Sequence, residues 1–323
     1  MLRCFILASE IHVIFVFEGS FFTTVGIFSG ILLYSVKSVH KKYIRMNTRR
    51  EFVKKGVAGI VAGSMVSMPE GFGLPVKEKK EDLFKLAMAG FSFVNFNLDQ
   101  SLEMMKKTDV HYLCIKDFHL PYASTAEQIA AFHEKLKQSG VTGYAVGPIY
   151  AKSATEIDNS FDYAKRVGVK LIVGIPNHED LPYVAKKVKE TGIRYAIHIH
   201  GPGDKLYPNA ISVYNLIKDL DPGVGICFDM GHDARYGNDP IADLEKYQKR
   251  IFDLHLKNVT SATHDGTTCE LGRGVIDIPL FIKTLRKIKY SGMCSLEYEK
   301  DMKDPLAGIA ESVGYYKGVC DAV

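Results

Sequence analysis

The sequence lacks the cysteine pattern of a disulfide or zinc scaffold. Six cysteines occur in 323 residues, and no two of them have the spacing of a zinc ribbon or a CxxC redox pair. Cys114, Cys227 and Cys294 fall inside apolar runs, where a free thiol commonly packs as a small hydrophobic side chain. We therefore expect buried free thiols rather than a cysteine framework.

A glycine signature for dinucleotide binding is also missing. No G-x-G-x-x-G motif follows an apolar run or opens a helical segment anywhere in the chain. The first apolar run of the main domain leads instead into Phe91–Asn95. This absence argues against a doubly wound nucleotide-binding sheet.

The main domain has no excess of positive charge. The whole chain has a formal net charge of +4, but nine of the 41 Lys and Arg and three of the 37 Asp and Glu lie in the first 68 residues. The remainder therefore carries 32 basic and 34 acidic residues, a net charge of −2. A slightly acidic body argues against a broad nucleic-acid footprint, so we expect no nucleic-acid partner.

We interpret the N-terminal segment as a targeting signal rather than as part of the folded domain. Residues 46–68 contain Arg49-Arg50, Phe52 and a short Gly- and Ala-rich apolar run, which is typical of a twin-arginine export signal. This indicates an exported, periplasmic protein. The alternative is an amphipathic start to the domain.

Residues 1–45 can be interpreted in two ways. Residues 11–36 are largely apolar and precede a basic stretch, so they would serve as a membrane anchor if translated. Met46 stands immediately before the export signal, which favours Met46 as the initiator and residues 1–45 as upstream read-through.

From residue 83 onward, apolar runs alternate eight times with segments of helical period. Strands are expected over 85–93, 110–118, 143–149, 170–175, 194–200, 225–229, 251–257 and 293–299. Helices are expected over 99–107, 124–140, 161–167, 180–190, 209–220, 240–250, 278–287 and 305–318. Eight strand–helix units in about 240 residues predict a single α/β domain over 83–323, a (β/α)8 TIM barrel.

Ionisable side chains gather where the later strands end, which is where TIM barrels carry their chemistry. Because side chains alternate along a strand, His198 and His200 share one face of the fifth strand. Likewise, the seventh strand places Asp253, His255 and Lys257 on one face, and the eighth places Ser295, Glu297 and Glu299 on one face. The sixth strand ends at Asp229, three residues before His232.

Buried charge of this amount is costly unless it is paired or bound to a metal. A set of His198, Asp229, His255 and Glu297 would take one ligand from each of four strands. Mixed imidazole and carboxylate ligation suits Mn, Zn, Fe or Co. We therefore expect one divalent metal, with Mn as first choice.

The motifs at these strand ends resemble those of the xylose isomerase-like TIM barrel superfamily. They are FDMGH ending at His232, DLHLKN around His255, LGRGVID over 271–277 and CSLEYE around Glu297. The resemblance extends from Leu83 to the C-terminus. That group includes sugar-phosphate isomerases and epimerases, tagatose 3-epimerase-type enzymes, inosose dehydratases and endonuclease IV-like nucleases.

In the epimerase branch, the resemblance implies Glu, Asp, His and Glu as metal ligands on strands five to eight. Asp229, His255 and Glu297 match three of them, but strand five has His198, in AIHIHGPGD, where epimerases place the Glu. That difference counts against a symmetric two-carboxylate epimerisation. The His-rich strand is more similar to the inosose dehydratase branch.

The expected reaction begins at a metal-bound ketose. The metal would act as a Lewis acid that stabilises an enediolate, with Glu297 as base and ligand and with His198 or His200 as the acid partner. An isomerase or epimerase acting on a ketose is the first expectation. A dehydratase or lyase on a keto-sugar or keto-inositol and a non-catalytic sugar-binding barrel are the alternatives; a DNA-repair nuclease is disfavoured by the charge.

Four further residues are candidates for contact with a carbohydrate substrate. His232 and Arg273 match positions that reach substrate in the superfamily, and Lys257 would hold a negative or hydroxylated group. His119, in KDFHLP, follows the second strand. Salt bridges or structural hydrogen bonds are the other interpretation of Lys257, Arg273 and His119. The sequence leaves the oligomeric state open.

Overall fold

The computed structural model describes residues 22–23, 34–35 and 81–323. The chain divides into two units, Met1–Lys79 and Lys80–Val323. In the first unit, strand β1 (Phe22–Thr23) pairs antiparallel with β2 (Tyr34–Ser35). The rest of the predicted 1–45 segment and the whole predicted export signal, 46–68, lie outside the described residues.

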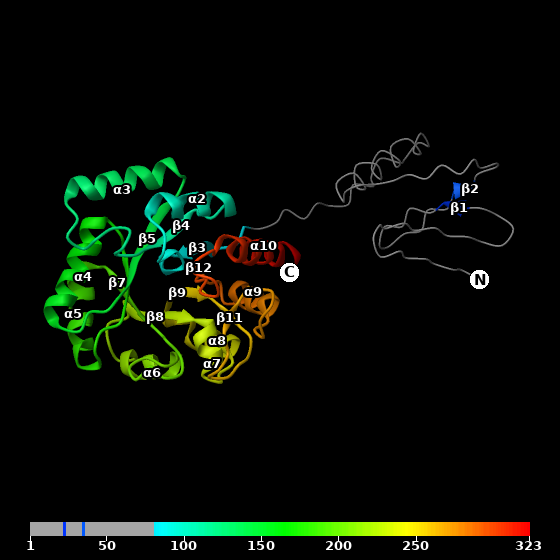
Figure 1. The fold of residues 1–323 in the computed structure, drawn as a ribbon. Helices are drawn as coiled ribbons and strands as arrows, with labels where there is room; N and C mark the ends of the chain where they lie inside the picture. Colours follow the sequence, from blue (N-terminus) through cyan, green and yellow to red (C-terminus); the bar gives the residue numbers. More distant parts are fainter. Residues whose placement is uncertain (1–21, 24–33, 36–80) are drawn as a thin grey trace, which may run out of the picture. The chain divides into compact units, whose positions relative to one another are not determined.

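The second unit is a closed barrel of eight parallel strands in the order β12-β3-β4-β5-β6-β7-β8-β9, which confirms the predicted TIM barrel (Figure 1). The strands are β3 (Lys85–Ala89), β4 (Tyr112–Ile115), β5 (Thr142–Ile149), β6 (Leu171–Gly174), β7 (Arg194–His198), β8 (Val224–Asp229), β9 (Ile251–Leu256) and β12 (Met293–Leu296). The last strand, β12, pairs with both β9 and β3 and so closes the ring.

Helices surround this barrel on the outside (Figure 1). They are α2 (Leu98–Thr108), α3 (Ala126–Gln138), α4 (Ala154–Val167), α5 (Leu181–Thr191), α6 (Ala210–Ile217), α7 (Met230–Arg235), α8 (Pro240–Tyr247), α9 (Ile278–Lys287) and α10 (Leu306–Ala322). Short 3-10 helices occupy Gly90–Phe93, His178–Asp180 and Gln248–Arg250.

Local sequence signals explain where several of these helices begin and end. Asn97 and Thr125 cap α2 and α3 through reciprocal capping boxes, which satisfy backbone N–H groups that the first turn leaves free. Gly168 and Gly192 follow α4 and α5 with φ of 82° and 67°, a left-handed conformation that glycine adopts without steric cost.

The element boundaries differ from the predictions at a few places. The strand expected over 85–93 ends at Ala89, because Gly90–Phe93 turns into a 3-10 helix. Helix α4 begins at Ala154, earlier than the expected 161, because Ser153 caps it. Helix α7 and the hairpin of β10 (Asn258–Val259) with β11 (Thr268–Cys269) were not predicted.

The alternation along the strands separates two apolar environments. Outward side chains such as Leu254 and Leu256 are fully buried in the large core between barrel and helices. A smaller cluster of small side chains fills the barrel interior and includes Cys114, Ala196 and Cys227. Asp229, His255 and Glu297 come later along the chain than this inner layer, at, next to or after the strand end, and so lie at the C-terminal mouth.

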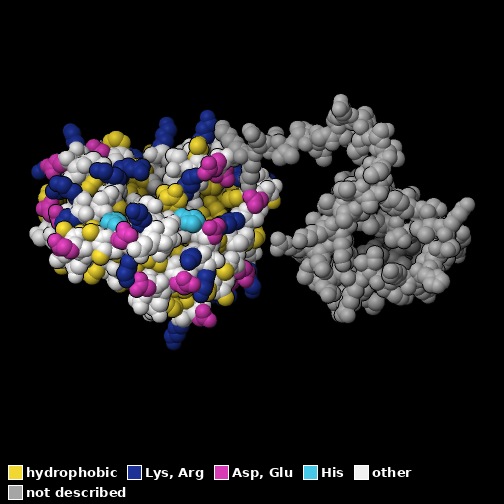
Figure 2. Space-filling model, turned by 90° about the horizontal axis from the view of Figure 1, so that it is seen from above, with side chains coloured by type: hydrophobic (Ala, Val, Ile, Leu, Met, Phe, Trp, Pro, Cys, Tyr) yellow, Lys and Arg dark blue, Asp and Glu magenta, His cyan; other side chains and the backbone are white. Residues whose placement is uncertain are grey.

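The surface seen from above mixes acidic, basic and apolar side chains over the described domain (Figure 2). Among the described residues, no helix is both long and apolar enough to span a bilayer.

Candidate metal centre at the barrel mouth

Four neighbouring strands bring together the four predicted metal ligands. His198 ends β7, Asp229 ends β8, His255 lies in β9, and Glu297 directly follows β12. The register pairs Asp229 with His255, and His255 with Ser295, so the ends of these strands stand at similar height. One ligand atom from each of the four residues lies within 4.8 Å of all the others.

These donor atoms fit a metal ion. The four side chains are at most 4% exposed. Within the described part of the chain, His198 Nδ1 and His255 Nε2 have no hydrogen-bond partner. Asp229 Oδ2 and His255 Nδ1 have only ion-pair contacts, to Lys257 Nζ at 3.0 Å and to Glu297 Oε2 at 3.1 Å. Buried polar atoms without a partner are costly, and a cation bound by two imidazoles and two carboxylates would satisfy them.

A lysine from the same strand as His255 already lies among the carboxylates. Lys257 is 1% exposed, and its Nζ lies 2.7 Å from Glu297 Oε2, 3.0 Å from Asp229 Oδ2 and 2.8 Å from Glu299 Oε2. Its stem passes Gly231, where an added Cβ would lie 2.8 Å from Lys257 Cγ. Glycine at 231 therefore leaves the room that the lysine needs.

The charges of this cluster support one another. Burial alone would lower the pKa of His255, but the nearby Glu297 outweighs burial and raises it to about 9. Burial would raise the pKa of Glu297, but His255 and Lys257 hold it well below its usual range. Similarly, burial would lower the pKa of Lys257, but the carboxylates of Asp229, Glu297 and Glu299 hold it well above its usual range. Without a metal ion, the cluster at neutral pH therefore combines ionised carboxylates with two cations, and a bound metal would displace the proton from the coordinating nitrogen of His255.

The remaining histidines of the mouth are neutral at pH 7. Burial lowers the pKa of His198 well below its usual range, lowers that of His200, and lowers that of His232 to about 4. The His198 and His200 rings are 4.5 Å apart. His200 is partly exposed, and its ring lies 3.6 Å from Asp204 and 3.3 Å from the hydroxyl of Tyr150.

The structure brings two of the four predicted substrate contacts to the cluster. His232 Nε2 lies 3.3 Å from Lys257 Nζ, and the backbone N–H of His232 donates to Asp229 Oδ1. Lys257 itself lies within the cluster, as described above.

The other two make different contacts. The described contacts of His119 run to Ser101 Oγ and the carbonyl of Phe96, at 3.0 and 3.1 Å. Arg273 is 62% exposed and pairs with both oxygens of Glu311 on α10, at 2.6 Å each. The contacts described for these two side chains are structural, and their predicted role in substrate binding stays a prediction.

Two groups were not named as site residues from the sequence. Glu299 contacts Lys257, and its place on the same face as Glu297 was the available signal. Below the cluster, the Tyr144 hydroxyl donates to Asp253 and also bonds Ser295 Oγ at 2.9 Å. Burial raises the pKa of Asp253 to about 7.

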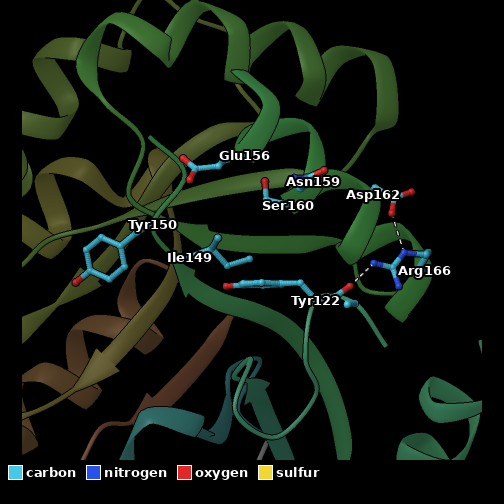
Figure 3. Close-up of a pocket in the computed structure, with 9 residues that line it drawn as sticks. Tyr122, Ile149, Tyr150, Glu156, Asn159, Ser160, Asp162 and Arg166 are labelled. Atoms are coloured by element: carbon cyan, nitrogen blue, oxygen red, sulfur yellow. Dashed lines mark hydrogen bonds and ion pairs between the residues drawn. The ribbon is translucent and has the colours of Figure 1, made fainter. Parts of the chain in front are cut away.

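A pocket of about 380 Å³ opens between the loop that follows β4 and helix α4 (Figure 3). Tyr122 and Arg166 line one part of it, and Tyr150 and Glu156 line another. Arg166 is held there by an ion pair with Asp162 at 2.7 Å. Tyr150 also contacts His200, so this side pocket adjoins the mouth without including the four ligands.

Sequence comparison agrees with this geometry. Residues 85–319, well over half of the chain, match the family described as xylose isomerase-like TIM barrel. The rhizopine catabolism protein MocC of Rhizobium meliloti is 29% identical over 133 residues, which cover 36% of this chain and 40% of that protein. An inosose dehydratase of Clostridium beijerinckii is 25% identical over 202 residues, covering 56% of this chain and 65% of the dehydratase. The chain thus matches less than two thirds of either relative's length.

Solved structures share the fold. An uncharacterised protein from Parabacteroides distasonis superposes with a TM-score of 0.58 at 24% identity, covering 73% of this chain and 99% of that one. The 3-keto-D-glucoside 4-epimerase YcjR from E. coli has a TM-score of 0.59 at 14% identity, covering 73% and 99%. These structures show the shared fold, and the family match over residues 85–319 shows that the chain belongs to the xylose isomerase-like TIM barrel family.

Proposed function

We propose that this protein is a metal-dependent dehydratase that removes water from a polyhydroxylated ketone, such as a keto-sugar or keto-inositol. The observation that carries the proposal is the imidazole of His198, which comes from β7 into contact with the rest of the cluster. An epimerisation with two symmetric carboxylates would need a carboxylate at that position. An elimination can proceed with one carboxylate base, so an imidazole in place of the second carboxylate is compatible with it.

Four residues would hold the metal: His198, Asp229, His255 and Glu297. A bound divalent cation would polarise the substrate carbonyl as a Lewis acid and so acidify the neighbouring C–H bond. Mn is our first choice, with Zn, Fe or Co as alternatives, because the set mixes nitrogen and oxygen donors. Lys257 would then share the carboxylates with the cation.

The protein's own groups divide the proton transfers. Glu297 is ionised at neutral pH, so it can accept the proton from the carbon beside the carbonyl. His200 is the better candidate for carrying a proton to the leaving hydroxyl, since it is partly exposed at the mouth whereas His198 is buried within the ligand set. Because His200 is neutral at pH 7, it would first take up the proton that Glu297 has accepted and then pass it to the leaving hydroxyl, which departs as water. Lys257 and His232 would orient hydroxyl groups of the substrate.

The curated relatives support this assignment. Four inosose dehydratases, from Clostridium, Lacticaseibacillus and Bacillus, match this chain at 25–27% identity over part of their lengths. Their name describes loss of water from an inosose, a cyclic polyhydroxy ketone. The partial coverage makes the substrate a proposal for this chain.

An isomerase or epimerase acting on a ketose is the second candidate. The observation in its favour is the His200–Asp204 pair at 3.6 Å, which provides a second proton carrier linked to a carboxylate. If this pair returns the proton to the substrate instead of protonating a leaving group, the product is an isomer or epimer.

Incubation in deuterium oxide separates the two candidates. The purified protein with Mn²⁺ is mixed with 2-keto-myo-inositol or with D-tagatose, and the products are followed by NMR. A dehydrated, unsaturated product supports the dehydratase, whereas deuterium at the carbon beside the carbonyl with retained hydroxyls supports the isomerase or epimerase. No change in any ketone would favour the non-catalytic sugar-binding barrel.

Metal content is the companion measurement. The full chain loaded with Mn²⁺ should retain about one ion per chain after dialysis, and Asp229→Ala should lose it, because Asp229 is one of only two carboxylates in the set. Elemental mass spectrometry measures both. Failure of the unmodified protein to bind Mn²⁺ would remove the metal from the mechanism.

Export to the periplasm remains part of the proposal. It rests on the Arg49-Arg50 motif and the apolar run of residues 46–68. A fusion of residues 46–68 to a reporter protein, with Arg49 and Arg50 replaced by Lys as control, tests it by fractionation of the bacterial cell. Membrane association of the full chain, lost when residues 1–45 are deleted, would indicate instead that 11–36 acts as a tether.

A further inference from the structure

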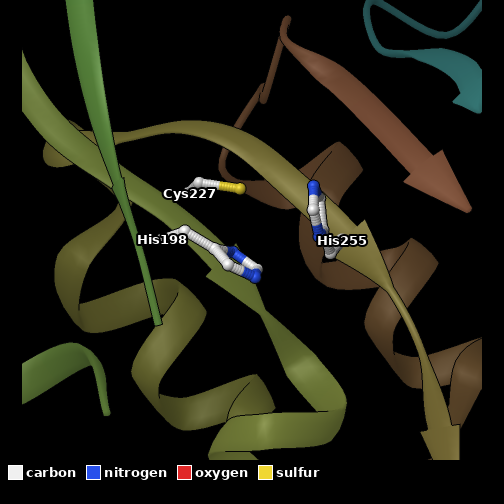
Figure 4. A group of neighbouring side chains, drawn as sticks. All are labelled: His198, Cys227 and His255. Atoms are coloured by element: carbon white, nitrogen blue, oxygen red, sulfur yellow. The ribbon is translucent and has the colours of Figure 1, made fainter. Parts of the chain in front are cut away.

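A cysteine lies directly beneath the proposed metal ligands. Cys227 is on β8, two residues before Asp229, so both side chains point into the barrel and Cys227 is one layer deeper. The sheet register pairs Cys227 with His198 on β7 and with Asp253 on β9. Figure 4 shows the thiol between the strands that carry His198 and His255.

The thiol and the two imidazoles form a second ligand set. Cys227 Sγ and one ring nitrogen each of His198 and His255 lie within 4.8 Å of one another. All three side chains are at most 2% exposed. His198 Nδ1 and His255 Nε2 have no hydrogen-bond partner in the described residues, so each histidine has a buried ring nitrogen available for a cation.

Cys114 shows what an ordinary buried thiol looks like in this barrel. It belongs to the same small-residue interior cluster as Cys227, and it donates a hydrogen bond to the carbonyl of Gly147 at 3.6 Å. No described metal-ligand group includes it. Packing alone therefore accounts for Cys114, whereas Cys227 also lies within ligand distance of two imidazoles.

The chemistry of the two sets differs. The outer set (His198, Asp229, His255 and Glu297) offers two carboxylates and suits harder cations such as Mn²⁺. The inner set (His198, Cys227 and His255) offers a sulfur and two nitrogens, which suit Zn²⁺, Co²⁺ and other thiophilic cations. Because both sets use the same two histidines, a single ion fills one or the other.

Lys257 distinguishes the sets further. Its ammonium already lies 2.7 Å from Glu297 and 3.0 Å from Asp229, so a cation in the outer set must share those carboxylates with it. The inner set uses neither carboxylate. A cation there leaves the ion pairs of Lys257 as the structure shows them.

We propose that this centre has two alternative coordination modes, the outer set for Mn²⁺-like cations and the inner set for thiophilic cations such as Zn²⁺ and Co²⁺. Binding in the inner set forms a metal–sulfur bond, and the thiol proton passes to the buffer, with no change of oxidation state. The inner mode withdraws the cation from Asp229 and Glu297, so a thiophilic ion there inhibits rather than supports turnover. That last consequence rests on the proposed function; the coordination itself does not.

Cobalt spectroscopy tests the inner set without reference to activity. The metal-stripped full chain is titrated with Co²⁺ under nitrogen in the presence of a phosphine reductant. We expect a near-ultraviolet thiolate-to-cobalt charge-transfer band that saturates at about one ion per chain. The band should be lost in Cys227→Ala, and it should persist in Cys114→Ala, the matched thiol control, and in Asp229→Ala, because the inner set does not include Asp229.

The metal affinities give a second readout. Cys227→Ala should weaken Zn²⁺ binding by at least about tenfold, the lower end of what the loss of even a supporting group costs a metal site. It should leave Mn²⁺ binding unchanged. If circular dichroism shows that the alanine variant is misfolded, Cys227→Ser replaces it, since the hydroxyl keeps the volume and binds these cations poorly.

The experiments distinguish failure of the inner set from failure of the outer set. Cobalt that binds without the charge-transfer band, or a band that survives in a folded Cys227 variant, overturns the inner set and leaves the proposed function intact. Conversely, a Cys227-dependent band in a protein that does not bind Mn²⁺ supports the inner set and refutes the outer one. Absence of binding by Co²⁺, Zn²⁺ and Mn²⁺ refutes both.

Discussion

The two halves of the barrel share one architecture and differ in what their strands carry. The first four strands, β3 to β6, end at Ala89, Ile115, Ile149 and Gly174. The last four, β7, β8, β9 and β12, carry the histidines, carboxylates and lysine of the mouth. The fold thus repeats eight times, whereas the chemistry occupies the half of the ring contributed by the C-terminal part of the chain.

The comparison shows how a barrel accommodates a costly site. Burying an ion costs several kcal/mol even after the protein relaxes, and the second half buries several. They are tolerable because each one contacts an opposite charge, as Lys257 contacts Glu297. The strands of the first half end in uncharged residues, and none of the four proposed ligands lies on them, so substitutions in the two halves should have very different effects.

The largest effect is expected for the proposed base. Glu297→Gln should lower the rate of deuterium exchange or elimination by about 10³-fold, since the variant loses the group that accepts the proton. NMR in deuterium oxide measures the rate, and circular dichroism checks the fold. Glu156→Gln, on α4 of the first half, should leave the rate near that of the unmodified protein. Undiminished exchange in Glu297→Gln would remove this residue from its role.

Replacement of the buried lysine comes next. Lys257→Met should destabilise the metal-free protein by about 3–5 kcal/mol, because it leaves buried carboxylates without their cation. Urea denaturation with a chelator measures this loss, and added Mn²⁺ should recover part of it. Lys116→Met is the first-half control: Lys116 donates to the carbonyl of Pro148, so the expected loss is only about 1 kcal/mol. Equal losses in the two variants would contradict the contrast between the halves.

A buried carboxyl group in α7 should make stability depend on pH. Burial raises the pKa of Asp233 from its ordinary value of 3.8 to about 7. A raised folded-state pKa contributes stability that is present below pH 3.8 and is lost as pH rises through 7.

Asp233→Asn removes this pH dependence. Relative to the unmodified protein, the variant should gain on the order of 2 kcal/mol of stability between pH 5 and pH 8, because it cannot ionise. Its side-chain oxygen can still accept from the backbone N–H of Ala210, as Asp233 does. Urea denaturation at both pH values measures the gain; a constant difference between the two proteins would show that Asp233 titrates normally.

The smallest effect is expected at the surface of the second half. Arg273→Ala breaks the exposed ion pair with Glu311 and should cost less than about 1 kcal/mol. Turnover should stay the same if Arg273 remains paired with Glu311 during the reaction. A large rise in KM without loss of stability would instead show that this side chain leaves Glu311 to bind substrate.

Much of this could be predicted from local sequence patterns. The eight strands follow from apolar runs, and the face shared by His255 and Lys257 follows from simple alternation. Alternation could also have pointed to Cys227, two residues before Asp229. Helix α7 escaped prediction because its six residues, MGHDAR, are too few to show a helical period.

Long-range contacts could not be predicted from the sequence patterns. Which cation pairs with which carboxylate depends on side chains from strands that are far apart in sequence, as with Lys257 and Glu297, 40 residues apart. Arg273 and Glu311 are separated by 38 residues, and neither residue's local sequence indicates the other. Such partners are determined by the packed geometry of helices and loops, which periodicity does not specify.

The place of β12 in the barrel determines when Glu297 joins the site during synthesis and folding. Glu297 follows β12, the strand that joins β9 to β3 and is the last of the eight to leave the ribosome. The proposed base therefore arrives only when the ring is complete. If Glu297 is the base, a partly folded chain in which β12 has not docked lacks that base and should show no turnover. Turnover can thus serve as a reporter of the final folding step.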